Sequence, residues 1–101
     1  MGISDKNRIA YQTAFNNVGE FIGELNREYG FRTLTPLDNL KTTLEISLWT
    51  LNAFNSIHKK TLKEYNAKSQ DLNKNRNDLL RRFQNAYRPL KQYIKTKEDS
   101  R

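Results

Sequence analysis

Residues 37 to 88 contain neither glycine nor proline, and this uninterrupted stretch of 52 residues constrains the fold more than any other feature of the sequence. Glycine and proline interrupt helices most strongly, so their absence permits helix throughout the stretch. No alternation typical of β-strands is present. A mostly apolar series with a spacing of seven runs through it: Leu37, Leu44, Leu51, His58, Tyr65, Leu72, Leu79, Ala86 and Tyr93. The stretch therefore predicts either one long helix or two helices that fold against each other.

The density of apolar residues favours two helices. Residues 37–57 have ten apolar residues of 21, residues 58–78 have four of 21, and residues 79–94 have eight of 16. A continuous helix of about 80 Å would need a second chain along its whole length, as in a coiled-coil dimer. If the chain instead reverses near Lys68, the two rich segments cover each other and the poor segment becomes the far end of a helical hairpin. Four residues there compete with helical hydrogen bonding and favour a turn: Asn66, Ser69, Asn73 and Asn75.

An earlier helix is predicted over about 5–29. Ser4 or Asp5 can cap its start, and Gly30 is expected to end it in the left-handed region, with Phe31 folded back onto the helix. Its apolar residues alternate steps of four and three, which keeps them on one face: Tyr11, Phe15, Val18, Ile22, Leu25 and Tyr29.

The second helix is predicted over about 36–67, because Thr35 can cap it and Pro36 suits its first position. It carries two apolar stripes, one formed by Leu37, Leu40, Leu44, Leu48 and Leu51, the other by Ile46, Trp49, Ala53 and Ile57. Two stripes predict two neighbours. The pair Gly19 and Gly23 in the first helix predicts close approach of one of them.

The third helix is predicted over about 70–95, with a kink near Pro89 because proline removes one backbone hydrogen bond. The fold class is all-α: a single helical domain over residues 1–101, built as a three-helix antiparallel bundle whose second and third helices extend as a polar helical hairpin. The long-helix coiled-coil dimer is the alternative.

The residue types on which most catalytic and metal sites depend are scarce. The chain has no cysteine, and His58 is its only histidine, expected to be packed. Glu20, Glu24 and Glu28 form an acidic ladder, for which pairing with basic residues is a better interpretation than a cation site. No phosphate-binding loop, dinucleotide motif or nucleophile elbow occurs. We therefore predict no enzyme, no catalytic residue, no metal and no cofactor.

No apolar run approaches the roughly 20 residues that span a bilayer, and no N-terminal segment resembles a signal peptide. Together with the absence of cysteine, these features predict a cytoplasmic protein without a transmembrane segment.

The charge of the chain is unevenly distributed. Residues 1–56 hold five basic and six acidic side chains, whereas residues 57–101 hold thirteen basic and five acidic ones, within a net charge of +7. A basic half beside a nearly neutral half indicates a polyanionic partner, either nucleic acid or an acidic protein surface. A charged surface that only keeps the chain soluble is the alternative.

Basic residues recur along the third helix and gather late in the second. The candidate binding residues are Lys59, Lys60, Lys63, Lys74, Arg81, Arg82, Arg88, Lys91 and Lys95. Lysine and arginine can neutralise phosphates. Asp78 is placed to pair with Lys74 and Arg81 at helical spacing, which would weaken the local field. The sequence thus predicts a small non-enzymatic nucleic-acid-binding or accessory regulatory protein that uses its basic C-terminal helix.

The alternative function is a helical protein interaction module with no nucleic-acid role, such as an immunity, adaptor or assembly factor of phage or plasmid origin. Its expected surface is the stripe around Trp49, provided that the third helix leaves it uncovered, or the polar end of the hairpin. A second copy of the chain is then a candidate partner, as a homodimer.

Overall fold

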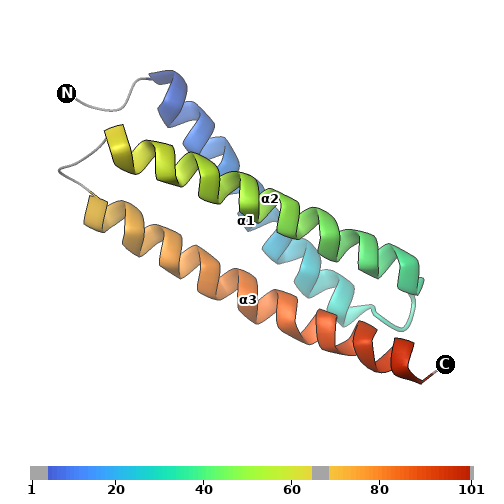
Figure 1. Cartoon of the computed structure of the whole chain (residues 1–101). Helices are drawn as coiled ribbons and strands as arrows, with labels where there is room; N and C mark the ends of the chain where they lie inside the picture. The colour runs from blue at the N-terminus through green and yellow to red at the C-terminus, as the bar shows by residue number, and fades with distance from the viewer. Residues whose placement is uncertain (1–4, 65–68, 101) are drawn as a thin grey trace.

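The computed structural model describes residues 5–64 and 69–100, which form three helices. α1 spans Asp5–Gly30, α2 spans Leu37–Glu64 and α3 spans Ser69–Asp99. Each helix packs against the other two, and Figure 1 shows successive helices running in opposite directions along an elongated bundle of 56 × 21 × 18 Å. No strand occurs in the described part of the chain. The predicted all-α three-helix bundle is confirmed.

The core is formed by apolar residues that recur at steps of three and four along each helix, a spacing that keeps them on one face. Burying one large apolar side chain of this kind stabilises the fold by roughly 1.5–3 kcal/mol. The core residues are Ala14, Val18, Ile22 and Leu25 of α1, Leu40, Leu44, Leu51 and Phe54 of α2, and Leu79, Phe83, Ala86, Leu90 and Ile94 of α3.

The buried face of α2 contains most of the first predicted stripe, because Leu40, Leu44 and Leu51 are buried, but it is rotated towards Phe54. Phe54, which belongs to neither stripe, is 1% exposed, whereas Leu48 is 38% exposed. α2 contacts α1 on one side and α3 on the other, so its buried face continues from the first stripe through Ser47 and Phe54, and Leu48 lies at its edge. The prediction that a neighbour covers the second stripe is wrong, because Ile46 is 43% exposed and Trp49 is 79% exposed.

The connection from α1 to α2 also differs from the prediction. Gly30 does not adopt a positive φ. Instead the backbone N–H of Phe31 donates to the carbonyl of Arg27, which continues the helical pattern, and the N–H of Arg32 then donates to Tyr29 in a tighter turn. Phe31 is exposed and does not fold back onto the helix. The chain leaves α1 by tightening its last turn, which requires no left-handed residue.

Gly19 and Gly23 do not mark a close approach between helices. A Cβ atom added at either glycine would meet nothing within 4 Å. Both lie off the stripe through which α1 packs, so the prediction based on their spacing is wrong.

The hairpin of α2 and α3 is confirmed by contacts between residues far apart in sequence. The Arg76 Nε donates to Asn55 Oδ1 over 3.4 Å, and a hydrogen bond of 3.2 Å joins His58 Nε2 to Asn73 Oδ1. The alternative, one continuous helix, does not form, since α2 ends at Glu64 and α3 is a separate helix that begins at Ser69. The predicted turn at Lys68 with Asn66, the heptad residue Tyr65 and the Ser4 cap lie outside the described residues.

A polar junction around His58 holds the three helices together at the far end of the bundle. His58 is 4% exposed. Its Nε2 lies 3.2 Å from Asn73 Oδ1 and its Nδ1 lies 3.2 Å from the Tyr11 hydroxyl, so the ring bonds to α3 on one side and to α1 on the other. Burial raises the pKa of Tyr11, so this hydroxyl keeps its proton at neutral pH. The Asn7 Nδ2 lies 2.7 Å from both carboxylate oxygens of Glu64, so α1 accompanies the hairpin to its far end.

α3 continues through Pro89 to Asp99, beyond the predicted end at residue 95. Proline leaves the carbonyl four residues earlier, that of Asn85, without its helical donor. Asn85 is exposed, so water can replace that donor. α3 therefore presents one unbroken outer face along the bundle.

The hairpin predicts that two Ser→Pro substitutions differ strongly in their effect on the free energy of unfolding. Ser69→Pro should change the free energy of unfolding by less than about 1 kcal/mol, because Ser69 is the first residue of α3 and proline suits that position. Ser56→Pro, at an exposed position inside α2, should cost about 3 kcal/mol or more. Urea unfolding followed by circular dichroism measures both, and equal losses would contradict the turn.

Candidate functional site

All nine basic residues predicted as binding residues are exposed. Lys59, Lys60 and Lys63 lie late in α2, and the other six lie on α3: Lys74, Arg81, Arg82, Arg88, Lys91 and Lys95. Four of the six are seven residues apart and therefore follow one side of the helix over about 32 Å. That side faces away from the buried stripe of Leu79, Phe83, Leu90 and Ile94. We call it the basic face of α3, together with Arg82 and Lys91 beside it.

Acidic residues neutralise only part of the basic face. Arg81 forms an ion pair of 2.5 Å with Asp78, as predicted from their spacing. Both side chains are largely exposed, so the pair adds little stability, but it offsets the charge of Arg81. Among the described residues, Arg82, Arg88, Lys91 and Lys95 make no ion pair. The Lys91 ammonium lies 5.8 Å from the centre of the Tyr87 ring, a contact that keeps its charge.

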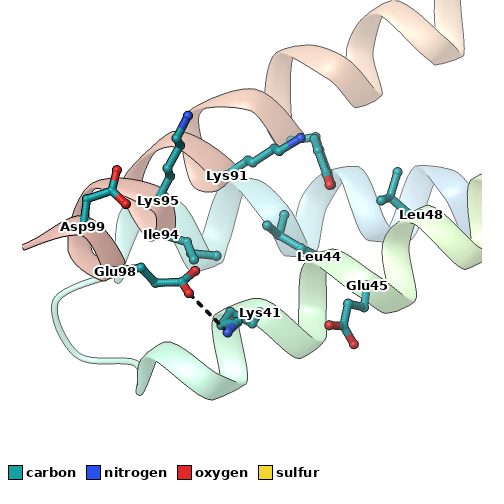
Figure 2. Close-up of a pocket in the computed structure, with 10 residues that line it drawn as sticks. Lys41, Leu44, Glu45, Leu48, Lys91, Ile94, Lys95, Glu98 and Asp99 are labelled. Atoms are coloured by element: carbon teal, nitrogen blue, oxygen red, sulfur yellow. Dashed lines mark hydrogen bonds and ion pairs between the residues drawn. The ribbon is translucent and has the colours of Figure 1, made fainter. Parts of the chain in front are cut away.

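A cleft between α2 and α3 lies beside the end of this face, and Figure 2 shows its lining. Its floor is apolar, formed by Leu44, Leu48 and Ile94, with Tyr87 at one side. Three basic and three acidic residues surround it: Lys41, Lys91, Lys95, Glu45, Glu98 and Asp99. The cleft is therefore electrically balanced, which does not suit a polyanion.

The lysines of this cleft differ in where their charge is directed. Lys41 is held by Glu98, with 3.5 Å between Nζ and Oε2. In Figure 2, the Lys95 ammonium extends away from α2 and from this pair. The charge available to a polyanion therefore lies on the outer side of α3. From residue 79 to residue 97 that helix has no acidic residue.

The lysines of α2 divide between two sides of the bundle. The hydrogen bonds His58–Asn73 and Asn55–Arg76 bring this part of α2 beside the first turns of α3. Lys59 and Lys63 therefore lie at the same end of the bundle as Lys74. Lys60 comes three residues after Ile57 and continues the stripe that contains Trp49, so it does not belong to the basic face.

Trp49 borders a shallow groove between α1 and α2, on the side of the bundle away from α3. The groove is lined by Ala10, Thr13, Ala14 and Asn17 of α1 and by Trp49, Thr50, Ala53 and Ile57 of α2. A second hollow continues it towards Ile46, lined by Glu20, Phe21, Glu24, Thr43 and Ile46. We call the two together the Trp49 face. Its α1 half was missed from the sequence, although small residues at steps of three and four beside the apolar stripe were the available signal.

The acidic ladder of α1 is partly paired, because Arg27 donates to Glu24. No group of three or more histidine, cysteine, aspartate or glutamate side chains suited to a metal ion occurs within residues 5–64 and 69–100. In the same ranges, no helix combines the length and apolar character needed to cross a bilayer.

No protein-family model, no curated protein and no solved structure matches the chain, so the case for its function depends on its own surfaces.

Proposed function

We propose that this chain is a small non-enzymatic nucleic-acid-binding protein of the cytoplasm and that the basic face of α3 contacts the sugar-phosphate backbone. One observation carries the proposal: four cations, Arg82, Arg88, Lys91 and Lys95, are exposed and form no ion pair with any residue of 5–64 or 69–100, on a helix segment that has no acidic residue. Each such cation that meets a phosphate releases condensed counterions from the nucleic acid, which favours binding.

The shape of the bundle supports this assignment. α3 has 31 residues and lies at an edge of the bundle, where its whole outer side is free of α1 and α2. A helix of about 10–12 Å diameter fits the major groove of B-DNA, which is about 12 Å wide. Gln84, Asn85 and Gln92 lie among the cations and can donate further hydrogen bonds. Because phosphate contacts carry no sequence information, backbone recognition is expected to dominate.

A second candidate function, binding of a protein, is favoured by the exposed Trp49 face on the other side of the bundle. An acidic protein surface is also a chemically suitable partner for the basic face. Binding to the basic face is distinguished from binding to the Trp49 face by which substitutions remove it.

Neutralising three cations of the basic face should remove most nucleic-acid binding. The variant Arg88→Gln, Lys91→Gln, Lys95→Gln should bind a labelled duplex about 100-fold more weakly or worse at 50 mM salt, because three phosphate contacts are lost. Glutamine is a good helix former, so the fold should be kept. Fluorescence anisotropy with duplex DNA, single-stranded DNA and RNA measures the effect.

The matched control is Lys6→Gln, Arg27→Gln, Lys60→Gln, which removes the same charge from exposed sites away from the basic face. Its affinity should stay within about threefold of the original chain. Equal losses in both variants would show that only net charge matters, and the basic face would then not be the binding surface.

Releasing Arg81 from its acidic partner should strengthen binding. Asp78→Asn breaks the ion pair with Arg81 and should raise the affinity by several-fold, because one more cation becomes available to phosphate. Asp71→Asn changes the net charge equally on the same helix but breaks no ion pair among the described residues. Anisotropy titrations of both variants at one salt concentration compare their affinities for nucleic acid. A larger increase in affinity with Asp71→Asn would be evidence against binding by the basic face.

A further inference from the structure

The Trp49 face is an exposed, largely apolar surface formed jointly by α1 and α2. Trp49 is 79% exposed and Ile46 is 43% exposed. The hollow beside Trp49 is lined by small side chains, including Ala10, Thr13 and Ala53, which leave room for a flat ring. Tryptophan beside such a hollow is the composition typical of protein interfaces.

The Trp49 face also has an acidic and a basic end. Glu20 and Glu24 border it near Ile46, with Arg27 paired to Glu24, which leaves one net negative charge. Lys6 precedes Ala10 by four residues and Lys60 follows Ile57 by three, so helical spacing puts both on the sides of their helices that line the groove, at its other end. Glu64, bonded to Asn7, is the acidic residue at that end, which leaves one net positive charge among the three. A face of this kind is complementary to itself when a second copy lies on it in the opposite direction.

The way in which α1 and α2 are aligned determines the position along the helices at which the charges of two antiparallel copies would lie opposite each other. Phe15 of α1 lies level with Phe54 of α2, because their rings are in edge contact with centres 5.9 Å apart. Lys6 and Glu24 are each nine residues from Phe15, in opposite directions. Eighteen residues make five full helical turns, so both side chains lie on the same side of α1.

We propose that the Trp49 face binds the same face of a second copy of this chain, antiparallel, about a two-fold axis that crosses the helices level with Ala53 and Phe54. In that arrangement α1 faces the second α1, and each Lys6 meets a Glu24. Trp49 of each copy comes level with Ile57 of the other and fills the hollow between Ala10, Thr13 and Ala53. Two-fold dimers of this kind, with one patch used twice, are the commonest oligomers.

This proposal does not depend on nucleic-acid binding, because the groove is lined by α1 and α2 only. It has a consequence for the basic face, however. Since the two bundles meet through the side away from α3, the dimer carries two basic faces pointing in opposite directions. Such a dimer can bridge two nucleic-acid segments.

The first test is the molar mass in solution of the full chain, by sedimentation equilibrium from 1 µM to 1 mM. The stretch from Ile46 to Lys60 is about 21 Å long, which is short for a standard interface, so the dimer is expected to form towards the upper end of this concentration range. The only tryptophan is Trp49, and its fluorescence should shift to shorter wavelength as the dimer forms. A monomer at 1 mM overturns the proposal and leaves the face to a helix of another protein.

Trp49→Glu should weaken the dimer by at least about 30-fold, as expected for a central tryptophan. Leu34→Glu is the matched control, because Leu34 is also 79% exposed but lies in the loop between α1 and α2. Both positions are exposed, so both variants should fold. A dimer that resists Trp49→Glu, or that is lost with Leu34→Glu, contradicts the proposed interface.

A charge exchange tests the antiparallel direction. Lys6→Glu and Glu24→Lys should each weaken self-association by about tenfold, because each creates two like-charged pairs across the axis. An equimolar mixture of the two variants should recover the original affinity, since a mixed dimer has both pairs restored. Failure of the mixture to recover rules out the two-fold arrangement.

Discussion

Each of the three helices buries one stripe of apolar residues spaced three and four apart, and the three stripes pack together along the axis of the bundle. This packing determines which side chains of each helix are exposed. α2 lies between its two neighbours, so its buried stripe is centred on Leu44, Leu51 and Phe54. That rotation exposes Trp49. α3 buries Leu79, Phe83 and Leu90, and it therefore presents its cations outward. Both candidate surfaces are consequences of the same packing.

Much of the fold can be predicted from the sequence, because it follows from the local spacing of apolar residues and from the number of apolar residues in each segment. Helix number and approximate bounds follow from apolar spacing, and the hairpin follows from the low apolar density after Ile57. The rotation of α2 cannot be predicted in this way, since its apolar residues occupy more than half of its circumference and only contact with two partners selects Phe54 over Leu48. The end of α1 at Gly30 agrees with the prediction, but its left-handed conformation does not, because an exposed helix end can tighten its last turn without a left-handed glycine.

The basic face could be predicted residue by residue, because helical spacing alone groups Lys74, Arg81, Arg88 and Lys95. Only the structure shows which of these cations are offset by nearby acidic groups. Asp78 engages Arg81, and the cleft beside Lys91 holds as many acidic as basic groups. Lys60, in contrast, was grouped with the cations by sequence proximity, and its position along α2 assigns it to the Trp49 face. The polar end of the hairpin, which had been a candidate surface, is partly used internally by the His58 junction.

The salt dependence of nucleic-acid binding tests the central claim most directly, because it counts the phosphates that the chain neutralises. Affinity for a duplex, measured by anisotropy from 50 to 200 mM salt, should fall along a line of log affinity against log salt with a slope of about −3.6, the value for four contacts. Those four contacts correspond to Arg82, Arg88, Lys91 and Lys95. A slope near zero, or no binding at 50 mM salt, would contradict the account and leave the basic face as a solvated surface.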